Sequence, residues 1–90
     1  MINSHYKYQI RNKMKTLDEF VQLFAEQFEE TEENLFTPET EFRSLDEWSS
    51  LISLSVIAMV DEEFDVALKG ADIRNANTIE DLYKIVISKV

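Results

Sequence analysis

Apolar residues recur at helical spacing in the first third of the chain. The apolar positions follow the spacing i, i+3, i+4, i+7 and i+11, with charged residues between them: Leu17, Phe20, Val21, Phe24 and Phe28. This period is typical of an amphipathic helix whose apolar face is buried. Thr16, followed three residues later by Glu19, matches a capping box. We therefore predict a first helix over about residues 17–31.

The next segment, residues 32–47, loses this period. It contains the only proline, Pro38, together with many acidic residues. We predict a long loop held to the body of the protein by isolated apolar side chains. These are Leu35, Phe36, Phe42 and Leu45.

The most apolar segment follows, and either Ser49 or Ser50 is a suitable N-cap for it. It has no Gly or Pro up to about Phe64, which predicts a second helix. Its apolar residues form two stripes: Val56, Val60 and Phe64 in one, and Leu51, Leu54 and Ala58 in the other. Either this helix is packed on both sides, or one stripe lines a ligand cavity or contacts partners.

The last third of the chain predicts a short element and a final helix. After Gly70 the segment around Asp72 and Ile73 fits a short third helix or a plain loop. Thr78 and Asp81 match a second capping box. The helix that it begins has an inner face of Ile79, Leu82, Ile85 and Val86, which Val90 would extend.

The 90 residues fit one domain. We expect residues 1–13 to be a tail and residues 14–90 to form the domain. Alternatively, Tyr6, Tyr8 and Ile10 alternate as a short strand packed on the body.

Composition favours an all-α domain and leaves the role of its acidic charge open. One Gly and one Pro are too few for a fold of many hairpins. The net charge is −9, and all 18 acidic residues follow residue 16. Such a field repels nucleic acid and anionic membranes and favours encounter with basic protein surfaces, although acidity alone more often serves solubility. The sequence has no cysteine, no apolar segment of membrane-spanning length and no signal-peptide pattern. We therefore expect a soluble, unexported, cytoplasmic protein.

Candidate catalytic chemistry is scarce. The only histidine is His5, in the predicted tail, so no Ser-His-Asp or HExxH arrangement can be built from the remainder. Asp61, Glu62, Glu63 and Asp65 point in different directions on a helix and lack the spacing of a calcium loop. We expect neither an enzyme nor a metal site.

Ser50, at the start of the second helix, has two possible roles. It is either a helix cap or a modification site, where an attached phosphate would meet the unpaired N–H groups and the positive end of the helix dipole. The sequence spacing leaves both roles open.

The segment from Phe42 to Asp65 resembles the second helix of acyl carrier proteins and the loop before it. In that family a leader ending in Asp-Ser-Leu carries the modified serine, and the helix ends in an acidic Glu-Glu-Phe segment. Ser50-Leu51 and Glu62-Glu63-Phe64-Asp65 match at the right separation. The segment from Thr78 to Leu82 is similar to the family's last helix.

This resemblance implies an up-down four-helix bundle with a long first loop and a short third helix. It further implies that a phosphopantetheinyl transferase attaches 4'-phosphopantetheine to Ser50, and that acyl groups are then carried as thioesters. Leu51, Leu54 and Ala58 become candidate contacts with cargo or partners. Asp61 and Glu62 become candidate contacts with acyl-loading and acyl-processing enzymes that have basic surfaces.

The resemblance is incomplete around the serine. Ser49 replaces the usual aspartate, Glu47-Trp48 replaces a short Gly-containing segment, and Ile52 and Ser55 stand where fatty-acid carriers commonly have acids. The alternative is a degenerate, unmodified helical domain that acts as a protein-interaction module.

Overall fold

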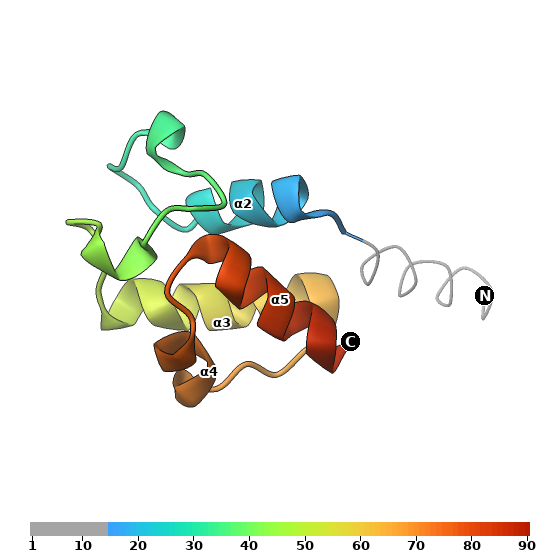
Figure 1. Cartoon of the computed structure of the whole chain (residues 1–90). Helices are drawn as coiled ribbons and strands as arrows, with labels where there is room; N and C mark the ends of the chain where they lie inside the picture. The colour runs from blue at the N-terminus through green and yellow to red at the C-terminus, as the bar shows by residue number, and fades with distance from the viewer. Residues whose placement is uncertain (1–14) are drawn as a thin grey trace, which may run out of the picture.

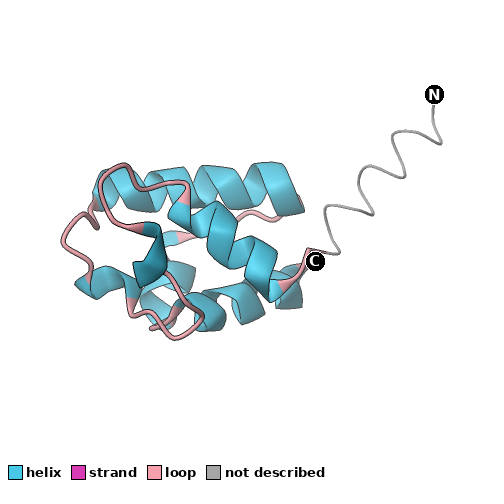
Figure 2. Ribbon diagram, turned by 90° about the horizontal axis from the view of Figure 1, so that it is seen from above, coloured by secondary structure: helices cyan, strands magenta, loops and turns pink. Residues whose placement is uncertain are grey.

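The computed structural model describes residues 15–90, which form four α-helices and no strand (Figures 1 and 2). The order is α2 (Leu17–Ala25), η1 (Glu33–Leu35), η2 (Phe42–Ser44), α3 (Ser50–Phe64), α4 (Gly70–Asn75) and α5 (Ile79–Lys89), where η denotes a 3-10 turn. This is the predicted all-α bundle of acyl-carrier type. The predicted tail and the residues proposed for its strand, as well as His5, lie outside the described residues.

All four helices contribute buried residues to the core. Helix α2 packs against both α3 and α5, and α4 packs against α5. In Figure 1, α2 leads away from the N-terminus and α3 runs back below it, so the two are antiparallel. The long connection between them, residues 26–49, contains both 3-10 turns.

Local capping explains where the helices start. The Thr16 hydroxyl accepts the N–H of Glu19, whose carboxylate accepts the N–H of Thr16. Thr78 and Asp81 form the same reciprocal pair at the start of α5. Both capping boxes confirm the sequence prediction, because each satisfies N–H groups that the first helical turn leaves unpaired.

The first helix is shorter than predicted. It ends at Ala25, where the predicted helix ran to about residue 31. The N–H groups of Gln27 and Phe28 donate three residues back, and the Gln27 side chain donates to the carbonyl of Leu23. A longer helix would have placed the acids of residues 26–33 at its negative end, with no basic residue to offset them.

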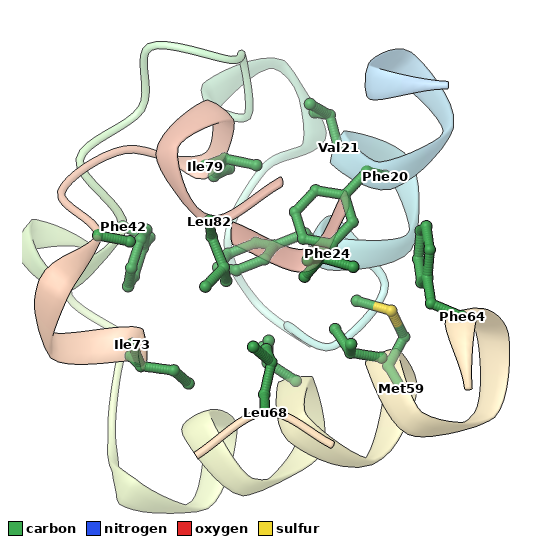
Figure 3. Packing of buried hydrophobic residues seen from close by; sticks show 14 of the residues in the cluster. Phe20, Val21, Phe24, Phe42, Met59, Phe64, Leu68, Ile73, Ile79 and Leu82 are labelled. Atoms are coloured by element: carbon green, nitrogen blue, oxygen red, sulfur yellow. The ribbon is translucent and has the colours of Figure 1, made fainter. Parts of the chain in front are cut away.

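The core is apolar and strongly aromatic (Figure 3). Phe20 lies between elements, with its ring centroid 5.7 Å from that of Phe64 and 5.5 Å from that of Tyr83. The fully buried large side chains are Phe20, Phe24, Phe42, Phe64, Ile79, Leu82, Val56, Val60 and Val86. Loop residues Phe36 and Phe42 are buried as predicted, but Leu35 is 53% exposed and does not pin the loop. Of the residues predicted for the inner face of the last helix, Ile85 is only half-buried, and Val90, which follows the end of α5, is exposed.

The two stripes of α3 have different environments. Val56, Val60 and Phe64 are completely buried. Leu51 and Leu54 are 73% and 62% exposed, and Ala58 is also exposed. Helix α3 is therefore not buried on both sides, and its second stripe faces solvent.

Truncation of Phe64 to Ala should lower the free energy of unfolding by about 3–5 kcal/mol, because it leaves a cavity in a packed core. Leu54→Ala is the matched control on the same helix and should change stability by less than about 0.5 kcal/mol. Urea or thermal unfolding followed by circular dichroism measures both. Equal unfolding midpoints for the two variants would contradict this assignment of the two faces.

Candidate functional site

The two serines at the start of α3 have different environments. Ser49 is the N-cap: its backbone is extended, and its hydroxyl accepts the N–H of Ile52 at 3.3 Å. Ser50 is the first helical residue and is exposed. Within residues 15–90, its hydroxyl makes no hydrogen bond to protein. The cap therefore engages Ser49 and leaves the Ser50 hydroxyl exposed to solvent.

The start of α3 is also the positive end of a helix dipole. Helix α3 has 15 residues and no acidic residue in its first turn. The hydrogen bonds of the described residues leave the N–H groups of Ser50 and Leu51 without a protein acceptor. Unpaired N–H groups and the helix dipole together favour an anion at this end. A phosphodiester on Ser50 thus fits the local electrostatics.

Glu47 connects the segment before Ser50 to the loop after α2. We call residues 42–49 the leader. The Glu47 carboxylate accepts the N–H groups of Glu29 at 2.8 Å, Glu30 at 3.0 Å and Thr31 at 2.9 Å. It also accepts the Thr31 hydroxyl at 2.7 Å. These are charge-assisted bonds, the stronger kind of hydrogen bond in proteins.

Trp48 fixes the next position of the leader. Its ring is nearly parallel to that of Phe24, at an interplanar angle of 2° and a centroid distance of 6.3 Å. It also lies 5.0 Å from Phe42 and 6.4 Å from Phe28, centroid to centroid. Glu47 and Trp48, the pair at which the sequence differs from the pattern of acyl carrier proteins, are thus both held by specific contacts.

Arg43 joins the other end of the leader to α4. Its guanidinium donates to the carbonyls of Ile73 at 2.6 Å and Ala76 at 2.5 Å, and it lies 5.2 Å from the centroid of the Phe42 ring. A cation at a helix C-terminus satisfies carbonyls that have no partner within the helix.

Sequence reasoning did not find the contacts of Arg43 or Glu47. Only the unusual Glu-Trp pair marked this region.

An open groove of about 520 Å³ lies beside the leader. Loop residues Glu30, Thr31, Glu32 and Leu35 form one side, and leader residues Ser44, Leu45, Asp46 and Glu47 form the other. The hydrogen bonds of Glu47 therefore join the two sides.

The predicted contact residues line the exposed side of α3. Leu51, Leu54 and Ala58 are exposed, and Asp61 and Glu62 are exposed near the C-terminal end of the helix. Ala58 and Glu62 also border a second groove of about 270 Å³ between α2 and α3. Its other lining residues are Leu23, Glu26, Gln27, Ser55, Met59 and Glu63. The structure thus places these residues on the surface, and their binding roles stay predictions.

Residues 15–90 contain neither a cluster of metal ligands nor a helix of membrane-spanning character. No group of three or more His, Cys, Asp or Glu side chains in this range is arranged to hold a metal ion. No helix in the same range is long and apolar enough to cross a membrane.

A four-helix bundle with a free serine at the start of its longest helix has the architecture of a carrier domain. Comparison with protein families agrees, because the model described as "Phosphopantetheine attachment site" matches residues 18–86. The chain belongs to this family. Domains of the family are carriers, which fits a non-catalytic role and implies attachment of phosphopantetheine. No curated protein and no solved structure gave a significant match.

The hydrogen bonds of Glu47 predict a pH-dependent contribution to stability. The N–H of Glu29, followed by the Thr31 hydroxyl, holds the pKa of Glu47 below its usual value of 4.5. A carboxylate with a lowered folded pKa stabilises the fold fully above its unfolded pKa, and this contribution disappears as pH falls through the folded pKa. We expect Glu47→Gln to be less stable than wild type at about pH 7, and the difference to narrow below pH 4.5.

Urea unfolding at about pH 7 and about pH 3 measures this difference. Glu30→Gln is the matched control, because it removes the same charge from the same loop and the Glu30 side chain makes no hydrogen bond in the described residues. Its difference from wild type should not narrow in the same way. A gap between Glu47→Gln and wild type that is equal at both pH values would contradict the prediction.

Proposed function

We propose that this protein carries acyl intermediates as thioesters on a 4'-phosphopantetheine arm attached to Ser50. The observation that supports this choice of residue is the division of roles between the two serines. Ser49 serves as the helix cap, and Ser50 presents an exposed hydroxyl at the first helical position. Membership of the phosphopantetheine attachment family supports the nature of the group.

The attachment reaction is a phosphoryl-type transfer to a hydroxyl. The Ser50 oxygen attacks the phosphorus of coenzyme A that bears the pantetheine. A new oxygen–phosphorus bond forms, the bond to adenosine 3',5'-bisphosphate breaks, and the serine proton passes to a base of the transferase. When bound, the arm supplies a thiol, which a chain with no cysteine lacks. The unpaired N–H groups of Ser50 and Leu51 then favour the phosphodiester charge, typically by about 0.3–1 kcal/mol for an exposed site.

Ser49 can cap the helix as the family's aspartate does, but it has no carboxylate. Its hydroxyl caps the helix, since Ser and Asp are both good N-caps. A hydroxyl does not supply the carboxylate that often acts as a ligand in the transferase complex. This substitution favours a dedicated transferase. It is also the observation that supports the second candidate function, an unmodified interaction module.

The proposed partners are the transferase and acyl-loading and acyl-processing enzymes with basic docking surfaces, in lipid or secondary-metabolite biosynthesis. Helix α3 has no ionisable side chain between Ser50 and Val60, and its acids are concentrated at the C-terminal end. Asp61 and Glu62 are exposed there. We assign long-range attraction to these acids, and contact with cargo or partner to Leu51, Leu54 and Ala58.

Intact mass tests the attachment site. Incubation with coenzyme A and a broad-specificity transferase should add one phosphopantetheine to the wild type and none to Ser50→Ala. Ser49→Ala is the matched control and should still be modified, although loss of the cap costs about 1 kcal/mol of stability. A mass gain that survives Ser50→Ala would refute the assignment. An unmodified wild type, also when isolated from its native host, would favour the interaction module.

Charge reversal tests the docking surface. Asp61→Lys combined with Glu62→Lys should slow association with the transferase about tenfold at low salt, because electrostatic steering sets the encounter rate. The effect should shrink as salt rises, since charges are screened over about 8 Å at physiological ionic strength. Charge reversal should reduce the association rate more than Ile52→Asp does, because Ile52→Asp removes no acid from the docking surface. Stopped-flow measurements across a salt series give these rates.

The matched control is Glu32→Lys combined with Glu33→Lys, which changes net charge equally on the loop that contains η1. Its association rate should change less than that of the α3 variant. Rates that respond to neither salt nor charge reversal would show that the Leu51, Leu54 and Ala58 stripe holds the interface instead.

A further inference from the structure

The three residues that precede Ser50 are each fixed by a different interaction. Glu47 is bonded to residues 29–31, Trp48 is stacked on Phe24, and Ser49 caps α3. Because a chain spans at most about 3.6 Å per residue, the Ser50 Cα lies within about 11 Å of that of Glu47. The position of the acceptor serine therefore depends directly on how Glu47 is held.

All hydrogen bonds that join residues 26–35 to the leader within the described chain end on the Glu47 carboxylate. The two segments are far apart in sequence, with separations of 16 to 18 residues for these bonds. Both segments are rich in acids, including Glu29, Glu30, Glu32 and Asp46, and nothing in their net charge draws them together. Apart from these hydrogen bonds, the two segments are linked by the ring contact between Trp48 and Phe28.

We propose that Glu47 is a positioning residue for the modification of Ser50. Its carboxylate, bound to the backbone of residues 29–31 and to the Thr31 hydroxyl, holds the leader in the conformation that the transferase recognises. This inference rests on the proposed function. It assigns to Glu47 no contact with coenzyme A or with the reacting atoms, because its two oxygens already accept four hydrogen bonds within the protein.

The expected kinetic signature follows from population arithmetic. If loss of Glu47 reduces the fraction of molecules with a competent leader to about one tenth, the apparent affinity falls about tenfold. At saturation the transferase selects the competent conformation, so kcat is retained. We therefore expect Glu47→Ala to raise KM for the carrier about tenfold with little change in kcat. Glu47→Gln should have an intermediate effect, because its amide oxygen still accepts hydrogen bonds.

Thr31→Val separates positioning from direct contact with the transferase. Valine has nearly the same shape as threonine but no hydroxyl, so the variant loses the 2.7 Å hydrogen bond from Thr31 to the Glu47 carboxylate. The variant leaves the sequence of the leader itself unchanged. It should raise KM in the same direction as the Glu47 variants. In the double variant Thr31→Val, Glu47→Ala the two effects should not add, because both act through one contact.

Two controls exclude general causes. Glu30→Gln removes an acid from the same groove and should leave KM unchanged. Val86→Ala destabilises the core from α5, distant in sequence from the leader, and should lower the melting temperature without a change in KM. Circular dichroism at the assay temperature establishes that each variant is folded. Hydrogen exchange compares Glu47→Ala with the two controls, Glu30→Gln and Val86→Ala. Of these three variants, only Glu47→Ala should lose protection at the amides of residues 29–31.

The outcomes are distinguishable. A wild type that gains no phosphopantetheine from the broad-specificity transferase and carries none when isolated from its native host overturns the proposed function, and this inference with it. A wild type that is modified, with folded Glu47→Ala and Thr31→Val at the wild-type KM, overturns the positioning role alone. A raised KM for Glu47→Ala together with an unchanged KM for Thr31→Val also overturns it, because the carboxylate would then contact the transferase directly. A raised KM for both, with both controls unchanged, supports the proposal.

Discussion

The packing of aromatic rings around Phe24 is the interaction on which the position of the serine depends. Phe24 is fully buried on α2, and its ring contacts residues from the loop and from the leader. These contacts are with Phe28, Phe36, Phe42 and Trp48. A connection of 24 residues would otherwise carry a large conformational entropy. Aromatic side chains offset this cost with large buried area at few rotatable bonds.

This packing also explains which polar contacts are possible. With Phe28 and Trp48 brought together at 6.4 Å, the backbone of residues 29–31 and the Glu47 carboxylate come within hydrogen-bonding distance. Arg43, next to Phe42, reaches the end of α4 in the same way. The leader is therefore attached to the loop, to the core and to α4, and the start of α3 is held by elements from most of the chain.

Local signals predicted the helices well, and long-range contacts explain the failures. The capping boxes at Thr16 and Thr78 depend on residues three apart, so sequence alone located both helix starts. The end of α2 could not be predicted, because a carboxylate 16 to 18 residues away takes the N–H groups that a longer helix would have used. The exposed stripe of α3 was recognised as a second face, but only its environment in the fold showed that it is open to solvent. The choice between Ser49 and Ser50 as the cap likewise needed backbone geometry, since both residues are good caps.

Trp48 is the only tryptophan in the chain, and it is stacked on Phe24 two residues before the exposed serine. Indole emission responds to the polarity and mobility of its surroundings, so the tryptophan fluorescence of this protein arises from one ring at the place where the chain departs from its family. Rearrangement of the leader, whether caused by an enzyme, by an attached arm or by its cargo, would alter the exposure of that ring. The domain thus contains a natural optical probe of the state of its attachment site, with no label required.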